Sequence, residues 1–222
     1  MLLVPYEIET LEQERPWANW TIISVISLVS LGWIFGILTD SQVMPLVLHG
    51  WNPAGIFGHV LLHADFIHWL GNMIFLWVFG NAICTNIGNW RYIGVFAGCA
   101  VIAAMVQNVM DGTPAIGASG AINGITGMVL AMYPVNRVSM FWVFLIKGGT
   151  FQCRAWLVIG MWFLFDLLGV ATGGGGIAYW AHLGGLAGGL LIGLVGLQTG
   201  WIRLTGCDNR SLLQLLKRER EE

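Results

Sequence analysis

Six apolar stretches, each near the length needed to cross a lipid bilayer, follow one another along this chain of 222 residues. A helix needs about 20 residues to cross the roughly 30 Å hydrocarbon core. Only 10% of the residues are charged and 56% are hydrophobic, whereas about a quarter of the residues in a soluble domain are charged. We therefore predict an all-α polytopic membrane protein with helices at residues 20–38, 66–83, 92–109, 118–133, 155–170 and 177–197.

The segments between these stretches are polar or rich in glycine and proline, which is typical of turns. The apolar run at 138–146 is too short to span and precedes Lys147 and two glycines, so we expect a hairpin or an interfacial loop there. The chain then divides into an N-terminal tail (1–19), a six-helix membrane domain (20–199) and a C-terminal tail (200–222). The N-terminal tail is acidic, unlike the start of a signal peptide, so we expect the first helix to be retained.

The basic residues provide an independent check of this layout. With six spans, both tails lie on the same side as the second and fourth loops. All ten Lys and Arg residues fall in these segments, at Arg15, Arg91, Arg137, Lys147, Arg154, Arg203, Arg210, Lys217, Arg218 and Arg220. The positive-inside bias makes this side cytoplasmic, so both termini are predicted to be cytoplasmic. The basic tail needs no nucleic-acid partner to explain it.

The cysteines and the histidines of the first loop do not form a metal-binding pattern. Cys84, Cys153 and Cys207 fall on the predicted reducing side and Cys99 lies within a helix, so no disulfide is expected. None of them has Cys-x-x-Cys spacing. His59 and His63 have i, i+4 spacing, but no HExxH motif or second cluster accompanies them. We expect neither a metal nor an organic cofactor.

A serine stands among glycines at the start of the fourth predicted helix, in Gly117-Ala118-Ser119-Gly120. This helix has about 16 residues and is roughly 24 Å long, which is shorter than the hydrocarbon core, so its outer end should lie below the outer surface. A hydroxyl at that depth needs a hydrogen-bonding partner or water. His182 lies in the first turns of the sixth helix, which enters from the same side, so the two side chains can lie at similar depth.

Glycines on both helices would let the serine and the histidine meet. Small-residue stripes permit close helix packing, and they are formed here by Gly117, Gly120, Gly124 and Gly127 and by the pairs Gly184 with Gly188 and Gly185 with Gly189. An imidazole beside a hydroxyl can take its proton and later protonate a leaving amine. Such stripes commonly serve packing alone, but an ionisable residue within a span is a functional candidate.

The second predicted helix contributes two further polar residues near its outer end. His68 and Asn72 lie four residues apart and so share one helical face. Both can donate hydrogen bonds to the oxygen that gains charge in a tetrahedral intermediate, and the backbone N–H of Ser119 at a helix start is another candidate donor. The alternative is that both residues only bridge neighbouring helices.

These three motifs together resemble those of the rhomboid family of intramembrane serine proteases. Gly117-Ala118-Ser119-Gly120 matches the family's G-x-S-G motif, and Ala181-His182 with the glycines that follow matches the histidine motif of the sixth helix. The H-x4-H-x3-N pattern of the second helix is matched by His63, His68 and Asn72. The resemblance covers roughly residues 57–195, and six helices are the family's minimal core.

The resemblance implies a catalytic dyad of Ser119 and His182 without a third, acidic member. It implies an oxyanion site from His68, Asn72 and the Ser119 backbone, supported by His63, Gly117 and Gly120. It also implies a water-filled cavity open to the outer face and cleavage of single-span membrane proteins near the outer ends of their helices. Substrate would enter laterally, with the fifth helix and the loop above the fourth as gate elements.

Three positions depart from common family features. Asn123 stands where some members have a tyrosine that stacks on the histidine, so the imidazole is expected to rely on hydrogen bonds for its orientation. Residues 79–84 lack the acidic residue that often follows the second helix, and the first loop has no Trp-Arg pair near Trp51. None of these departures removes a catalytic group.

Two other classes of function compete with proteolysis. A rhomboid-like pseudoprotease would bind or escort transmembrane segments without cutting them, but such proteins typically lose the serine or the histidine. A small transporter is disfavoured because the helices show no ion-pair chain and no inverted repeat with broken helices. Asp166, near the outer end of the fifth helix, is expected to be interfacial rather than part of a proton relay.

The expected partners follow from the predicted class of protein. They are transmembrane protein substrates and the lipid bilayer, with a homo-oligomer left open. The expected location is a bacterial inner membrane.

Overall fold

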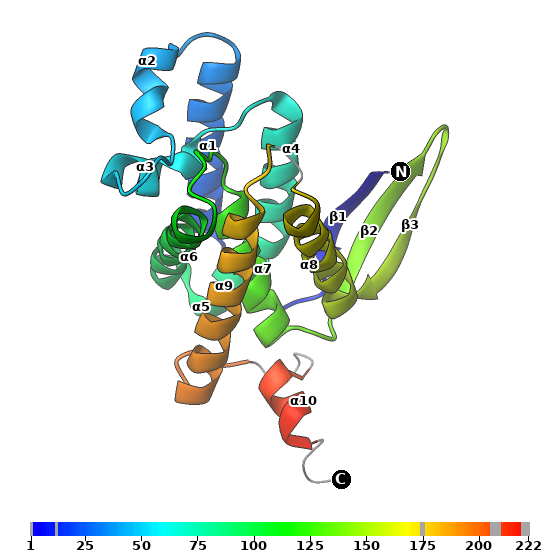
Figure 1. Ribbon diagram of the computed structural model, residues 1–222. Coiled ribbons are helices and arrows are strands. Elements are labelled where there is room, and N and C mark those ends of the chain that lie inside the picture. Colours follow the sequence, from blue (N-terminus) through cyan, green and yellow to red (C-terminus); the bar gives the residue numbers. More distant parts are fainter. Residues whose placement is uncertain (1, 12, 174–175, 205–209, 219–222) are drawn as a thin grey trace.

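The computed structural model describes residues 2–11, 13–173, 176–204 and 210–218 as a mostly helical molecule (Figure 1). The helices are α1 (Trp17–Ile34), α2 (Asp40–Val43), η1 (Met44–Leu46), α3 (Pro53–Gly58), η2 (His59–Leu61), α4 (Phe66–Phe75), η3 (Leu76–Gly80), α5 (Asn81–Ile87), α6 (Asn89–Met110), α7 (Ser119–Met132), α8 (Ala155–Thr172), α9 (Tyr179–Thr199) and α10 (Leu212–Arg218). The strands are β1 (Leu2–Ile8), β2 (Arg137–Phe144) and β3 (Lys147–Arg154).

The six predicted spans correspond to six helical segments. Among the described residues, five segments are long and apolar enough to cross a membrane: α1, the continuous run Phe66–Ile87, α6, α8 and α9. The sixth segment, α7, is apolar but has only 14 residues, a length of about 21 Å. The predicted polytopic, helical architecture is confirmed, and the ends of the spans differ from the predicted ones by a few residues.

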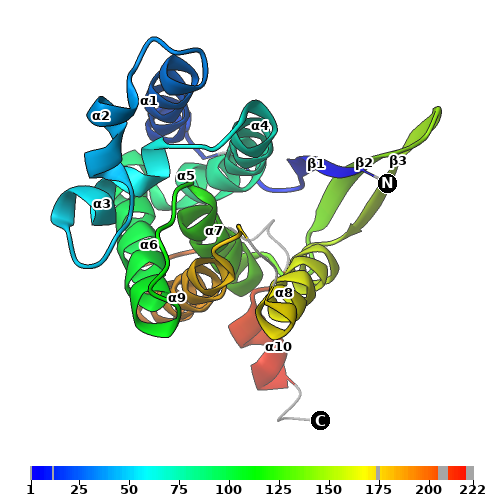
Figure 2. The same ribbon diagram turned by 45° about the horizontal axis from the view of Figure 1, so that its top comes forward.

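Helix α7 is the centre of the bundle. Nearly all of its side chains are buried, and it contacts α6, α8, α9 and the segment formed by α4, η3 and α5. Figure 1 shows α7 and α9 side by side, and in Figure 2 α4 and α8 lie to the right of α7, α4 above and α8 below. The short helix is therefore enclosed by protein rather than lipid, which permits polar residues at its start.

Close approach of α7 and α9 depends on the predicted glycine stripes. A Cβ at Gly185 would overlap the carbonyl oxygen of Gly120, and a Cβ at Gly189 would overlap that of Gly124. The other pair on α9, Gly184 with Gly188, faces Val106 and Ile102 of α6 instead. The two small-xxx-small pairs therefore serve two different interfaces.

The second span is not a regular α-helix, because η3 is a π-helical turn. A widened turn loosens backbone hydrogen bonds, and here Asn19 Nδ2 donates to the carbonyl of Leu76 at 2.9 Å and to Asn81 Oδ1 at 2.8 Å. The Tyr92 hydroxyl donates to Asn19 Oδ1 at 2.7 Å. A Cβ at Gly80 would collide with these polar atoms. One buried asparagine of α1 thus joins three spans at this turn.

The segment between α7 and α8 forms the predicted hairpin, and the N-terminal tail adds a third strand. Strands β1, β2 and β3 form an antiparallel sheet in that order, beside α8 and the second span (Figure 2). The register of β1 shifts between Pro5 and Glu7, and an edge strand tolerates a proline. Strand β1 was not predicted, since a short tail segment becomes a strand only when a partner strand is beside it.

Two contacts place basic segments at one end of the bundle. Arg91, in the first turn of α6, lies with its Cζ 5.9 Å from the ring centre of Trp201. Asn86 Nδ2 donates to the carbonyl of Arg203 at 3.4 Å. The thiols of Cys84, Cys99 and Cys153 are free, whereas Cys207 and Arg220 lie outside the described residues.

Candidate active site

Ser119 is the first residue of α7, and the backbone before it is shaped by glycine. Gly117 has a φ of +120°, in the region that favours glycine. A Cβ there would lie 3.0 Å from Cε1 and Nε2 of His68, so the missing side chain makes room for that ring. The N–H of Gly117 donates to the carbonyl of His59 at 2.9 Å. These features place the hydroxyl of Ser119 beside the predicted oxyanion residues.

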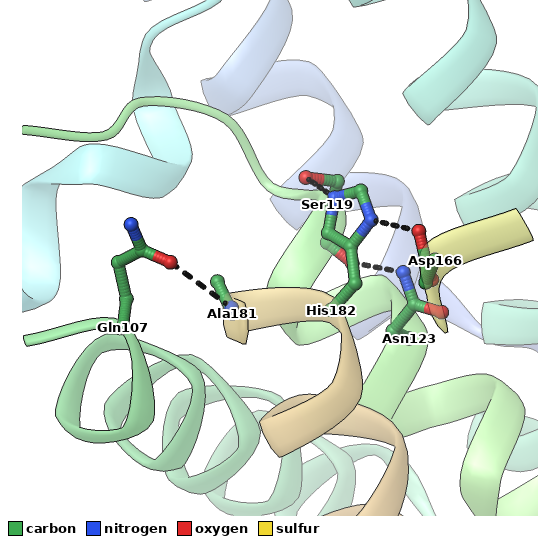
Figure 3. A network of polar contacts seen from close by, with 6 residues as sticks. All are labelled: Gln107, Ser119, Asn123, Asp166, Ala181 and His182. Carbon is green, nitrogen blue, oxygen red and sulfur yellow. Dashed lines mark hydrogen bonds and ion pairs between the residues drawn. The ribbon is translucent and has the colours of Figure 1, made fainter. Parts of the chain in front are cut away.

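The structure brings Ser119 and His182 together, as the motifs predict. His182 Nε2 lies 2.8 Å from Ser119 Oγ (Figure 3). The two residues belong to the first turns of α7 and α9, which can approach because Gly120 lies against Ala181 and Ala103 without a side chain of its own. The glycine after the serine is therefore a packing requirement of the pair.

Asp166 corrects the expectation of a pair without an acidic neighbour. Its Oδ1 lies 2.9 Å from His182 Nδ1, and the carboxylate points at the imidazole from α8 (Figure 3). Asp166 is buried, with 9% of its surface exposed, and its expected depth at the membrane interface stays a prediction. The sequence signal was present, because an acidic residue within a span is rare and usually paired.

His68 and Asn72 line the same cavity as Ser119 and His182. This cavity of about 320 Å³ lies between α4, α7 and α8, and Asn123 and Asp166 also border it. Asn72 is buried and its Nδ2 donates to the carbonyl of His68 at 3.0 Å. A second cavity, of about 520 Å³, shares His68 and is lined by the loops that precede α7 and α9.

His63 is buried behind the serine and has partners on both ring nitrogens. The hydroxyl of Ser30 donates to the carbonyl of Leu61, so His63 Nδ1, 2.8 Å from Ser30 Oγ, must donate to that oxygen. His63 Nε2 can then accept from the N–H of Ala118 at 3.4 Å. Burial lowers the pKa of His63 to about 3, with a smaller effect from His68. His63 is therefore neutral and supports the segment before Ser119.

Two amides complete the polar surroundings of the pair (Figure 3). Asn123 Nδ2 donates to the carbonyl of Ser119 at 3.0 Å. Gln107 of α6 is fully buried, and its Oε1 accepts from the N–H of Ala181 at 3.2 Å while its Nε2 donates to Asp111 Oδ2 at 2.9 Å. Gln107 thus satisfies an unpaired donor at the start of α9. Gln107 was not predicted from the sequence, although an amide inside an apolar span is a recognisable signal.

The fold and this site define an integral, multi-pass membrane protein with a serine and a histidine in contact at one end of its central helices. The family model for the rhomboid domain matches residues 50–199, which is more than half of the chain. The chain belongs to the rhomboid family.

Curated relatives carry names from the same family. "Rhomboid protein 1, mitochondrial" from Saccharomyces cerevisiae is 29% identical over 149 residues, which cover 64% of this chain and 41% of the yeast protein. "Rhomboid protease GlpG" from two strains of Klebsiella pneumoniae is 26% identical over 183 residues, which cover 80% of this chain and 62% of those proteins. The matched region is thus less than two thirds of the length of these relatives.

Proposed function

We propose that this protein is an intramembrane serine protease that hydrolyses peptide bonds in or near transmembrane segments of single-span membrane proteins. The observation that carries the proposal is the 2.8 Å distance between Ser119 Oγ and His182 Nε2, in a cavity that His68 and Asn72 also line. Membership of a family that includes proteins named rhomboid protease supports it.

The reaction uses Ser119 as nucleophile and His182 as base and then acid. Ser119 Oγ attacks the peptide carbonyl carbon while its proton passes to His182 Nε2. The tetrahedral intermediate collapses, the C–N bond breaks, and the same proton goes to the leaving amine. Water then attacks the acyl-enzyme, gives a proton to Nε2 and releases the carboxyl product as Ser119 regains its hydrogen.

The oxyanion would be bound by His68, Asn72 and the backbone N–H of Ser119. The first N–H groups of a helix have no partner inside the helix, and α7 begins at Ser119 without a side-chain cap. The amide nitrogen of Asn72 carries two hydrogens, so its bond to the carbonyl of His68 leaves one for an oxygen in the cavity. Preorganised donors of this kind stabilise the intermediate.

The predicted topology indicates on which side of the membrane the proposed reaction takes place. With residues 1–19 and 200–222 as cytoplasmic tails and 20–199 as the membrane domain, the positive-inside bias places Ser119 near the outer surface. The proposed location is a bacterial inner membrane, and the proposed partners are lipid and transmembrane substrates. Homo-oligomers remain an alternative arrangement.

Replacement of the nucleophile tests the proposal. Full-length protein in lipid vesicles, mixed with a panel of tagged single-span proteins, should release fragments, and Ser119→Ala should release none. Ser24→Ala is a matched control that should cleave like the wild type. Among the described residues, the Ser24 hydroxyl bonds only to the carbonyl of Trp20 on its own helix. Turnover by Ser119→Ala would refute the assignment.

A serine-reactive fluorophosphonate separates proteolysis from the rival function of a non-cleaving escort. If the protein is a protease, the fluorophosphonate should label the wild type and the Ser24→Ala variant but not the Ser119→Ala variant. An escort would bind the tagged segments and remain unlabelled. The presence of both Ser119 and His182 in contact favours the protease.

A further inference from the structure

We propose that Asp166 is a positioning residue that orients the His182 ring and sets its tautomer for the proposed serine–histidine pair, an inference that rests on the proposed function. Asp166 comes from α8, whereas Ser119 and His182 come from α7 and α9. Its Oδ1 is 2.9 Å from His182 Nδ1, on the far side of the ring from the serine. Three helices therefore meet in one line of polar atoms (Figure 3).

The hydrogen bonds fix which nitrogen of His182 carries its proton. An ionised carboxylate only accepts hydrogen bonds, and a neutral imidazole has one N–H. The Nδ1 of His182 must therefore donate to Asp166, which leaves the Nε2 lone pair to accept the Ser119 hydroxyl proton at 2.8 Å. The opposite tautomer would place a hydrogen between Nε2 and the nucleophile and prevent proton transfer.

The carboxylate also faces the charge that forms on the ring. When Nε2 takes the serine proton, the imidazole becomes a cation, and an adjacent carboxylate stabilises it. The side chains of His182 and Asp166 are only 15% and 13% exposed, so water screens this interaction less than at a surface.

The surroundings offer no competing role for Asp166 among the described residues. Among the described residues its carboxylate has one hydrogen-bond partner, His182, and no Lys or Arg forms an ion pair with it. The ring of Tyr179 lies edge-on to the imidazole, with centroids 6.3 Å apart, and Asn123 bonds to the backbone of Ser119 instead of the ring. The hydrogen bond that His182 Nδ1 donates to Asp166 is therefore what orients the imidazole, with Asn123 in the place of a stacking tyrosine.

The variant Asp166→Asn tests this role without removing volume. The amide of asparagine can donate to Nδ1 and so keep α8 tied to α9, but it then favours the wrong tautomer. We expect kcat to fall by at least about 100-fold, since loss of the acidic member of a serine–histidine–aspartate triad costs up to about 10⁴, with KM changed less than threefold. Asp40→Asn is the matched control, because Asp40 Oδ1 likewise accepts from a ring N–H, that of Trp33, at 2.9 Å.

A spectroscopic readout separates this proposal from the proposed function. In protein with ¹⁵N-labelled histidine, signals of His182 are assigned by their loss in His182→Ala. We expect a hydrogen on Nδ1 in the wild type and on Nε2 in Asp166→Asn. If the wild type neither cleaves nor reacts with fluorophosphonate, the protease assignment fails, while the tautomer measurement still decides whether Asp166 sets the ring.

A purely structural role would give a different pattern. The Asp166→Ala variant would then have a lower unfolding temperature, while Asp166→Asn would keep the wild-type unfolding temperature and kcat. An unchanged kcat in Asp166→Asn would overturn the proposal. A positioning role instead predicts that acetate, added in excess to Asp166→Ala, restores part of kcat, because the truncated side chain leaves room beside Nδ1. Unchanged tautomers in Asp166→Asn would also overturn it.

Discussion

At the scale of single residues, hydrogen bonds decide the proton positions of two histidines, and both end with the hydrogen on Nδ1. Ser30 imposes this on His63, whose Nε2 faces the backbone of Ala118. Asp166 imposes it on His182, whose Nε2 faces the hydroxyl of Ser119. The same tautomer therefore supports the backbone before Ser119 in the case of His63 and the proposed proton transfer in the case of His182.

Asn72 allows a direct test of the proposed oxyanion site. Removing one preorganised donor costs about 100- to 1000-fold in known oxyanion sites, so Asn72→Ala should lower kcat by about that factor and change KM little. The measurement is initial cleavage rate against substrate concentration. Asn86→Ala, at the opposite end of the same span and bonded to the carbonyl of Arg203, should retain the wild-type rate. Equal rates for both variants would leave the role to His68 and the backbone.

The sequence predicted Ser119, His182, His68 and Asn72, because each stands in a motif at the end of a span. It did not predict the partner of Asp166. Whether that carboxylate faces lipid, the interface or His182 depends on the rotation of α8 about its axis, and the apolar residues on nearly all sides of this helix do not define a buried face. Spacing along the chain therefore does not locate the contact.

At the scale of elements, the distance between α7 and α9 is short because their backbones are in direct contact at glycines. Gly189→Ala would force a methyl group against the carbonyl oxygen of Gly124. Overpacking of this kind costs about 1–3 kcal/mol, and the displaced helices would separate Ser119 from His182. We expect a lower unfolding temperature in detergent and a lower kcat.

Gly160 of α8 provides the control for this substitution. A Cβ there would meet nothing within 4 Å, and alanine is favoured over glycine in a helix by about 1 kcal/mol. Gly160→Ala should therefore keep or raise the unfolding temperature and keep the activity. If both variants behaved alike, close packing of α7 against α9 would not be what holds the pair together.

The elements themselves were predictable to different degrees. The length of an apolar stretch distinguishes a membrane span from a hairpin. The long stretches were predicted as spans and the short one at 138–146 as a hairpin or interfacial loop, and the structure has long apolar helices and a β-hairpin at these places. The π-turn at Leu76–Gly80 and strand β1 were not predicted, because each depends on a partner from elsewhere in the chain. Asn19 of α1 donates a hydrogen bond to the carbonyl of Leu76 in the π-turn, and β1 pairs with the edge of β2.

At the scale of the whole molecule, several polar residues of the site end are buried without charge, which links stability to pH. Burial lowers the pKa of His63 to about 3 and lowers that of His59 as well. Both residues lie in the segment between α3 and α4. In the unfolded chain a histidine binds its proton near pH 6.5. The unfolded state is therefore the first to gain protons as the pH falls.

The sign of the effect follows from this order of protonation. Stability contributed by neutral His63 is fully present above about pH 6.5 and is lost as the pH falls toward 3, by up to about 1.4 kcal/mol per pH unit. The unfolding temperature in detergent, measured between pH 4 and 7, should fall with decreasing pH. His63→Gln should show a smaller slope, because glutamine does not titrate, whereas replacement of the exposed His49 by glutamine should keep the wild-type slope. Equal slopes for wild type and His63→Gln would mean that His63 is not buried and neutral behind the serine.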